Sequence, residues 1–256
     1  MEMLNPHCGV DRDSRGVVRL TVCNAGSLNI LSSAVTDSVR EGFEKLAGDR
    51  DIRTVILAGQ SEKSMIGGAD IKEMAKLEQK SAEAFITRLR DLCEAVRNFP
   101  APVIARMPGW CLGGGLEVAA ACDFRIAAHD AKFGMPEVRV GIPSVIHAAL
   151  LPRLIGWSRA RWLVMTAENI DAPTALAWGL VDKVAKEGEL DIAVEHTVTA
   201  VLECGPEALR IQKDLLRQWE ELPLTESVNL SVGVFGKSFL TGEPQRLMQG
   251  FLERKR

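Results

Sequence analysis

Short apolar runs rich in β-branched residues alternate with longer amphipathic segments through the first two thirds of the chain. The apolar runs span residues 17–23, 54–57 and 102–106, and their composition is typical of buried strands. Residues 33–46 and 81–98 lie between them and have apolar side chains at three- and four-residue spacings, as amphipathic helices do. Strands separated by helices predict an α/β fold with parallel strand pairing.

The pattern changes after about residue 191, where only helical periodicity remains. It predicts four helices, over residues 192–202, 206–222, 225–240 and 243–254. Helices that follow an α/β unit without further strands usually form an added layer or an oligomer interface. We therefore predict a core over residues 1–190 and a C-terminal helical oligomerisation subdomain over residues 191–256.

Length, composition and charge exclude several classes of protein. The 256 residues are 46% hydrophobic and 25% charged, which is typical of a globular chain that buries a sizeable core. A net charge of −3 provides no overall basic field for nucleic acid or for an acidic membrane surface. No apolar run approaches the roughly 18 residues of a membrane span, and the N-terminus lacks the apolar segment of a secretory signal. We therefore expect a cytoplasmic protein without membrane or nucleic-acid partners.

Cysteine and histidine spacing argues against a metal site or a disulfide framework. The six cysteines include no CxxC pair, and the four histidines show neither HExxH nor HxxxH spacing. The sequence also lacks the GxGxxG fingerprint of dinucleotide binding and the GxSxG elbow of hydrolases. No tyrosine is present to act as an acid or base.

Two glycine-rich segments each open a predicted helix. The first reads IGGADIKE from Ile66, and the second reads GWCLGGGLE from Gly109. The first amides of a helix are unpaired and carry partial positive charge, so two of them directed at one point would form an oxyanion hole. Taken singly, either segment is equally consistent with a tight turn or with close helix–strand packing.

Two glutamates lie near these segments in the sequence. Glu117 comes three residues after Gly114, about one helical turn, so its side chain can face whatever that amide binds. Glu137 follows a turn set by Gly134 and Pro136. Two carboxylates on opposite sides of one water can take a proton from it and deliver a proton to a carbon. Alternatively, Glu117 only complements a helix N-terminus and Glu137 is solvated; spacing alone does not decide.

Together these motifs resemble the enoyl-CoA hydratase/isomerase (crotonase) superfamily over nearly the whole chain. The matching stretches include GGADIKEM, PVIARMPGWCLGGGLEVAAACDFRIA and AKFGMPEVRVGI. The resemblance implies an α/β fold, a crotonase-type spiral of ββα units with a C-terminal helical trimerisation region. It also implies a homotrimer or a dimer of trimers, and an acyl-CoA thioester substrate. No separate cofactor is implied, because coenzyme A is part of the substrate.

The resemblance assigns roles to four residues near the reaction centre. Ala69 and Gly114 match the two oxyanion-hole amides, and Glu117 and Glu137 match the two catalytic glutamates of hydratases. The implied reaction is hydration of a 2-enoyl-CoA to a 3-hydroxyacyl-CoA, in which Glu117 activates water for attack on C3 and Glu137 protonates C2. Other reactions of the same enolate chemistry remain open: isomerisation, C–C hydrolysis, decarboxylation or thioester hydrolysis. A non-catalytic RNA-binding relative is a further alternative, which the slightly acidic charge disfavours.

The resemblance also places residues around the coenzyme. Ile71 and Lys72 match positions beside the CoA pocket, and Lys255 matches a position that approaches the CoA phosphates of an adjacent subunit. After Glu137 the chain departs from the family, because GIPSVIHA from Gly141 replaces a longer glycine-rich loop. Ser144 and His147 then lie three apart on a predicted helix near the acyl end of the pocket. One of the two, with His147 as the candidate substrate-binding residue, is predicted to bind a polar or branched acyl group; the alternative is that His147 is a core or helix-surface histidine.

Overall fold

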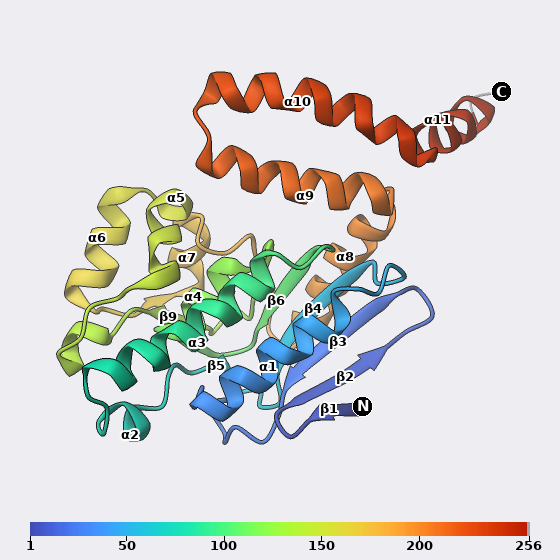
Figure 1. The fold of residues 1–256 in the computed structure, drawn as a ribbon. Helices are drawn as coiled ribbons and strands as arrows, with labels where there is room; N and C mark the ends of the chain where they lie inside the picture. Colours follow the sequence, from blue (N-terminus) through green and yellow to red (C-terminus); the bar gives the residue numbers. More distant parts are fainter. Residues whose placement is uncertain (255–256) are drawn as a thin grey trace.

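Two β-sheets form the centre of the protein in a computed structural model that describes residues 1–254 (Figure 1). The larger sheet has seven strands, in spatial order β1 (Glu2–Asn5), β2 (Cys8–Arg12), β3 (Val17–Val22), β4 (Thr54–Gly59), β6 (Val103–Met107), β8 (Phe124–Ala127) and β11 (Lys183–Val184). The smaller sheet has four strands, in spatial order β10 (Ile170–Asp171), β9 (Lys132–Gly134), β7 (Trp110–Leu112) and β5 (Ser64–Ile66).

The predicted parallel pairing is confirmed for the strands that carry the core. Strands β3, β4, β6, β8 and β11 pair in parallel, while β1 and β2 add an antiparallel hairpin at the edge. Every residue of β4 and β6 is buried, because helices cover both faces of the sheet at this point.

Eleven α-helices are present in the described part of the chain. They are α1 (Ser33–Leu46), α2 (Ile71–Met74), α3 (Gln79–Arg97), α4 (Gly114–Ala121), α5 (Leu151–Ile155), α6 (Trp157–Thr166), α7 (Ala172–Trp178), α8 (Leu190–Leu202), α9 (Pro206–Glu221), α10 (Leu224–Ser238) and α11 (Glu243–Arg254). Short 3₁₀ helices span Glu137–Val140, Ile146–Leu150 and Phe239–Thr241. The predicted helix at 33–46 is confirmed at both ends, and the helix predicted from residue 81 begins two residues earlier. A capping box between Glu78 and Ser81 sets that earlier start.

Helices α1 and α3 pack side by side on one face of the larger sheet (Figure 1). Helix α8 covers the opposite face, where Val194 and Val198 belong to one hydrophobic cluster with Ile56 and Ile104. Alternate residues of each strand therefore point to the two helical layers, as the period of two in a strand requires.

The C-terminal helices match the prediction of helices without strands, since no strand follows β11 within residues 1–254. Helix α9 lies between the body and α10, which runs back antiparallel to it (Figure 1). Helix α8 belongs with the sheet through its contacts, whereas α9 and α10 extend beyond it. The division at residue 190 stays a prediction.

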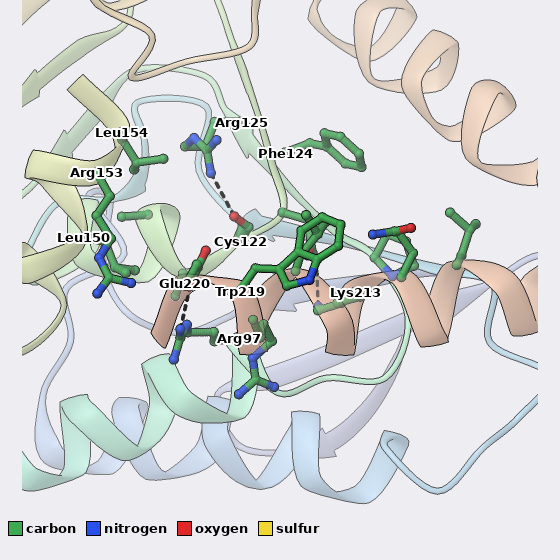
Figure 2. A pocket seen from close by; sticks show the side chains of 18 residues that line it. Arg97, Cys122, Phe124, Arg125, Leu150, Arg153, Leu154, Lys213, Trp219 and Glu220 are labelled. Atoms are coloured by element: carbon green, nitrogen blue, oxygen red, sulfur yellow. Dashed lines mark hydrogen bonds and ion pairs between the residues drawn. The ribbon is translucent and has the colours of Figure 1, made fainter. Parts of the chain in front are cut away.

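A cavity of about 540 Å³ separates α9 from the body (Figure 2). Charged pairs cross it: Lys213 Nζ on α9 lies 2.6 Å from Asp123 Oδ2, and Glu220 accepts a hydrogen bond from Arg97 on α3. Arg125 donates to the carbonyl oxygen of Cys122 at 2.8 Å on the same wall. The Lys213–Asp123 and Arg97–Glu220 pairs join α9 to the α/β layers, so they serve the architecture.

Candidate active site

The two glycine-rich segments converge on one cavity of about 680 Å³. Residues 67–69 and residues 113–114 both line it. They meet because β5 and β7 are parallel neighbours, so the loops that follow these strands leave the same edge of the smaller sheet. Gly113 has φ +50° and caps α4, a left-handed conformation that glycine adopts without steric cost.

The amides of Ala69 and Gly114 have no hydrogen-bond acceptor among residues 1–254. Their chain neighbours do have one: Asp70 N donates to the carbonyl oxygen of Leu31 at 2.9 Å, and Gly113 N donates to that of Gly134 at 2.9 Å. Both residues with unpaired amides line the cavity. A carbonyl oxygen bound there would meet two donors that the fold leaves available.

Glu117 lies on α4, a helix whose eight residues are all buried. Its side chain is 4% exposed and lines the cavity, and its Oε1 accepts a hydrogen bond from the amide of Ala148 at 2.9 Å. Burial raises the pKa of Glu117 to about 8, and the charge of Glu137 adds to that rise. This shift favours the protonated form of the Glu117 carboxyl near neutral pH.

Glu137 begins a 3₁₀ helix directly after Pro136 and lines the same cavity. Its Oε2 accepts a hydrogen bond from the hydroxyl of Ser144 at 2.9 Å. Its Oε1 faces the glycine-rich segment, because a Cβ atom on Gly113 would stand 2.4 Å from it. Burial raises the pKa of Glu137 as well, while the Ser144 hydrogen bond lowers it. The structure thus brings both predicted glutamates to one cavity.

The residues predicted to lie around the coenzyme differ in whether they line the cavity. Ile71 lines the cavity and is 60% exposed, at its mouth. Lys72 is the second residue of α2, and its amide donates to Asp70 at 2.8 Å, but its side chain is not part of the lining. Lys255 lies outside the described residues. The assignment of Ile71 and Lys72 to coenzyme binding stays a prediction.

His147 does not line the cavity. Its side chain is buried, and Nε2 lies 3.0 Å from Oε1 of Glu94 on α3. Burial lowers the pKa of His147, which favours the neutral imidazole. The core-histidine alternative describes this environment, and acyl-group binding by His147 stays a prediction.

The prediction that Ser144 and His147 share a helix is wrong. Ser144 lies in a loop, and the 3₁₀ helix begins only at Ile146. Val145 is extended (φ −134°, ψ −162°) and Ile146 has φ +41°, so the backbone cannot be helical before that point. Ser144 is consequently free to turn toward Glu137 while His147 turns toward α3.

The sequence does not predict three features of the site: the hydrogen bond to Glu117, the hydrogen bond to Glu137, and the apolar wall that α3 provides. The Ala148 amide that holds Glu117 is a backbone group and carries no signal in the sequence. Ser144 was predicted near the acyl group, and its hydrogen bond to Glu137 was not foreseen. The apolar wall comes from successive turns of α3, where Phe85, Ile86 and Leu89 line the cavity. Their helical spacing marked them only as core residues.

Two further observations bear on the chemistry. Within residues 1–254, no group of three or more His, Cys, Asp and Glu side chains is arranged to hold a metal ion. None of the described helices combines the length and the apolar character that crossing a membrane requires.

The parallel-stranded fold and the carboxyl pair beside two glycine-rich turns define the crotonase class of α/β enzymes. The chain belongs to the enoyl-CoA hydratase/isomerase family, whose model matches residues 12–256. It is accordingly an enzyme of the hydro-lyase type.

Individual relatives agree with this assignment. The chain is 32% identical to the short-chain-enoyl-CoA hydratase of Clostridium acetobutylicum, over 94% of this chain and 92% of the relative. It is 30% identical to the mitochondrial methylglutaconyl-CoA hydratase of Mus musculus, over 96% of this chain and 80% of the relative. The crystal structure of an enoyl-CoA hydratase from Mycobacterium smegmatis superposes with a TM-score of 0.93 at 30% identity, covering 98% of this chain and 97% of that one. The predicted crotonase fold is confirmed.

Proposed function

We propose that the protein hydrates a 2-enoyl-CoA thioester to a 3-hydroxyacyl-CoA. One observation carries the proposal: Glu117 and Glu137 line a single cavity together with the unpaired amides of Ala69 and Gly114. Relatives that are named enoyl-CoA hydratases support the same reaction. The substrate's coenzyme A is part of the thioester, so the proposal includes no separate cofactor.

The proposed chemistry is a syn addition, in which the two carboxyls lie on opposite sides of one water at the same face of the C2–C3 double bond. Glu117 takes a proton from water as the water oxygen bonds to C3, and the double-bond electrons move toward the thioester oxygen. The amides of Ala69 and Gly114 stabilise the charge on that oxygen. Glu137 then gives a proton to C2, which restores the carbonyl and completes the addition of one water.

The carboxyls of Glu117 and Glu137 are best treated as one acid–base pair, because the reaction needs both protonation states. Addition of water needs one carboxylate and one carboxylic acid at the same time. The pKa of Glu117, about 8, keeps a proton on the pair at neutral pH, and the charge of Glu137 influences it. In interacting groups the proton belongs to the pair, so its resting position does not assign the roles.

The remainder of the cavity suits an apolar acyl chain. Aliphatic and aromatic side chains from two helices and the following loop dominate the wall: Met74, Leu77, Phe85, Ile86, Leu89, Val140, Ile142 and Val145. In this proposal Ile71 flanks the coenzyme A portion of the substrate, and Lys72 approaches its nucleotide end. The acyl chain then extends from the glutamates toward α3.

We further propose that the enzyme assembles as a homotrimer or a dimer of trimers. Helix α10 exposes an apolar row at helical spacing, with Val228 58%, Val232 73% and Phe235 68% exposed. Contiguous exposed apolar surface of this kind favours association between chains. A cytoplasmic location stays a prediction from the sequence.

The decisive experiment follows the conjugated thioester absorbance of a short 2-enoyl-CoA. The protein should bleach this absorbance, and mass spectrometry should find a product heavier by one water. Glu117→Gln and Glu137→Gln should each lower the rate by about 10²–10⁴-fold, because a placed acid or base contributes that much. Glu83→Gln is the matched control, since Glu83 is an exposed carboxylate that lines the same cavity. Full activity in either active-site variant, or a product of unchanged mass, would contradict the proposal.

A further inference from the structure

One short segment contacts both glutamates. The hydroxyl of Ser144 donates to Oε2 of Glu137 at 2.9 Å, and the amide of Ala148 donates to Oε1 of Glu117 at 2.9 Å. The two donors stand four residues apart on the chain, whereas the glutamates come from α4 and from a separate 3₁₀ helix. The relative position of the two carboxyls therefore depends on residues 144–148.

Each contact uses one carboxylate oxygen and leaves the other. Oε1 of Glu137 faces Gly113, beside the unpaired amide of Gly114. Oε2 of Glu117 has no hydrogen-bond donor among residues 1–254. The oxygens left for water and substrate are thus Oε1 of Glu137 and Oε2 of Glu117. A carboxylate that receives one fixed donor loses the freedom to exchange its two oxygens.

The segment holds a backbone conformation that it would not adopt alone. Ile146 has φ +41°, a left-handed conformation that is sterically unfavourable for a β-branched residue. Such residues persist only where surrounding contacts hold them, and they occur preferentially at functional sites. Here Ile146 packs on the main hydrophobic core, and the next residue, His147, reaches Glu94 on α3 at 3.0 Å. Glu94 is itself held through its other oxygen by Asn98 at 3.0 Å.

We propose that Ser144 is a positioning residue for Glu137, and that the His147–Glu94 contact fixes residues 144–148 so that each glutamate presents one defined oxygen to the substrate. This inference rests on the proposed hydration. It adds that residues 144–148 orient the carboxyls of Glu117 and Glu137. Ser144 acts through Glu137 and touches no reacting atom.

The test compares Ser144→Ala with Ser144→Thr, which keeps the hydroxyl. A hydrogen bond to a charged group is worth enough that Ser144→Ala should lower kcat by about 10- to 100-fold. KM should change little, because Ser144 does not line the cavity. Ser144→Thr should recover most of the lost kcat. Equal kcat in the wild type and Ser144→Ala would overturn the proposal.

A double variant separates positioning from general structural damage. If Ser144 acts only through Glu137, adding Ser144→Ala to Glu137→Gln should cause no further loss of rate. Additive losses would mean that Ser144 acts by another route. His147→Leu should lower kcat with little change in KM, and His147→Gln, which keeps a donor toward Glu94, should lower it less. Equal kcat in these two variants would show that the His147–Glu94 contact does not fix residues 144–148.

The same set of variants distinguishes failure of this inference from failure of the proposed function. If Glu137→Gln retains full activity, the two-glutamate hydration mechanism itself fails. If Glu137→Gln is inactive but Ser144→Ala has the wild-type kcat, hydration stands and only the positioning role of Ser144 is lost.

Discussion

Burial of Glu117 in the active site makes ionisation of its carboxyl unfavourable for the folded protein. Its pKa rises from the usual 4.5 to about 8 because the side chain is buried. Between these pH values the folded protein binds a proton that the unfolded chain has released. Stability therefore falls as pH increases through this window, which is the expected sign for an acid whose pKa is raised by folding.

Replacing this carboxyl by a neutral amide should remove that pH-dependent cost. Glu117→Gln should be more stable than the wild type at pH 8, by on the order of 4 kcal/mol, and the advantage should vanish near pH 4.5. Urea unfolding of both proteins at several pH values measures the difference. An advantage that is constant with pH would show that Glu117 is not the group responsible.

Gly113 is a second residue whose identity the site requires. Its φ of +50° is unfavourable for any other side chain, and an added Cβ would lie 2.4 Å from Oε1 of Glu137. Gly113→Ala should therefore lose stability by about 1–2 kcal/mol and also lose most of the hydratase activity. Gly156→Ala is the control, because Gly156 has φ +78° with no atom within 4 Å of an added Cβ. It should lose similar stability in a denaturation experiment but keep its activity.

At the scale of elements, a buried cation on α9, Lys213, joins this helix to the body. Lys213 Nζ contacts Asp123 Oδ2 at 2.6 Å and donates to the carbonyl oxygen of Ala101 at 3.1 Å. Removing one partner of a buried pair leaves the other charge without compensation. Lys213→Met should lower the free energy of unfolding by roughly 3 kcal/mol, measured by denaturant titration. Gln212→Met, at the adjacent exposed position, should have little effect.

At the scale of the whole molecule, the apolar row of α10 should control assembly. Val232→Glu places a charge at a side chain that is 73% exposed in the single chain. If this surface is buried between subunits, the variant should shift the protein toward the monomer in light scattering after gel filtration. Lys80→Gln, on α3, is the control. It lowers the net charge by the same amount as Val232→Glu and should leave the mass of the assembly unchanged. An oligomer that persists in Val232→Glu would exclude this face from the interface.

The elements themselves were largely predictable because their signals are local. The amphipathic spacing of residues 33–46 depends on side chains three and four positions apart, and the helix appears there without a shift. Three strands of the larger sheet, β3, β4 and β6, were also located, although β4 extends to Gly59, two residues beyond the predicted end. The other strands escaped prediction; they have two to five residues, and so short a run carries little periodicity.

The sequence by itself determined the chemical groups of the site: the two glutamates, and the glycines whose backbone amides open helices. Only the tertiary structure decided which of those groups meet. Ser144 reaches Glu137 and His147 reaches Glu94 because an extended Val145 and a left-handed Ile146 turn the chain between them. Such backbone conformations are imposed by packing against distant helices, and no spacing rule along the chain reports them.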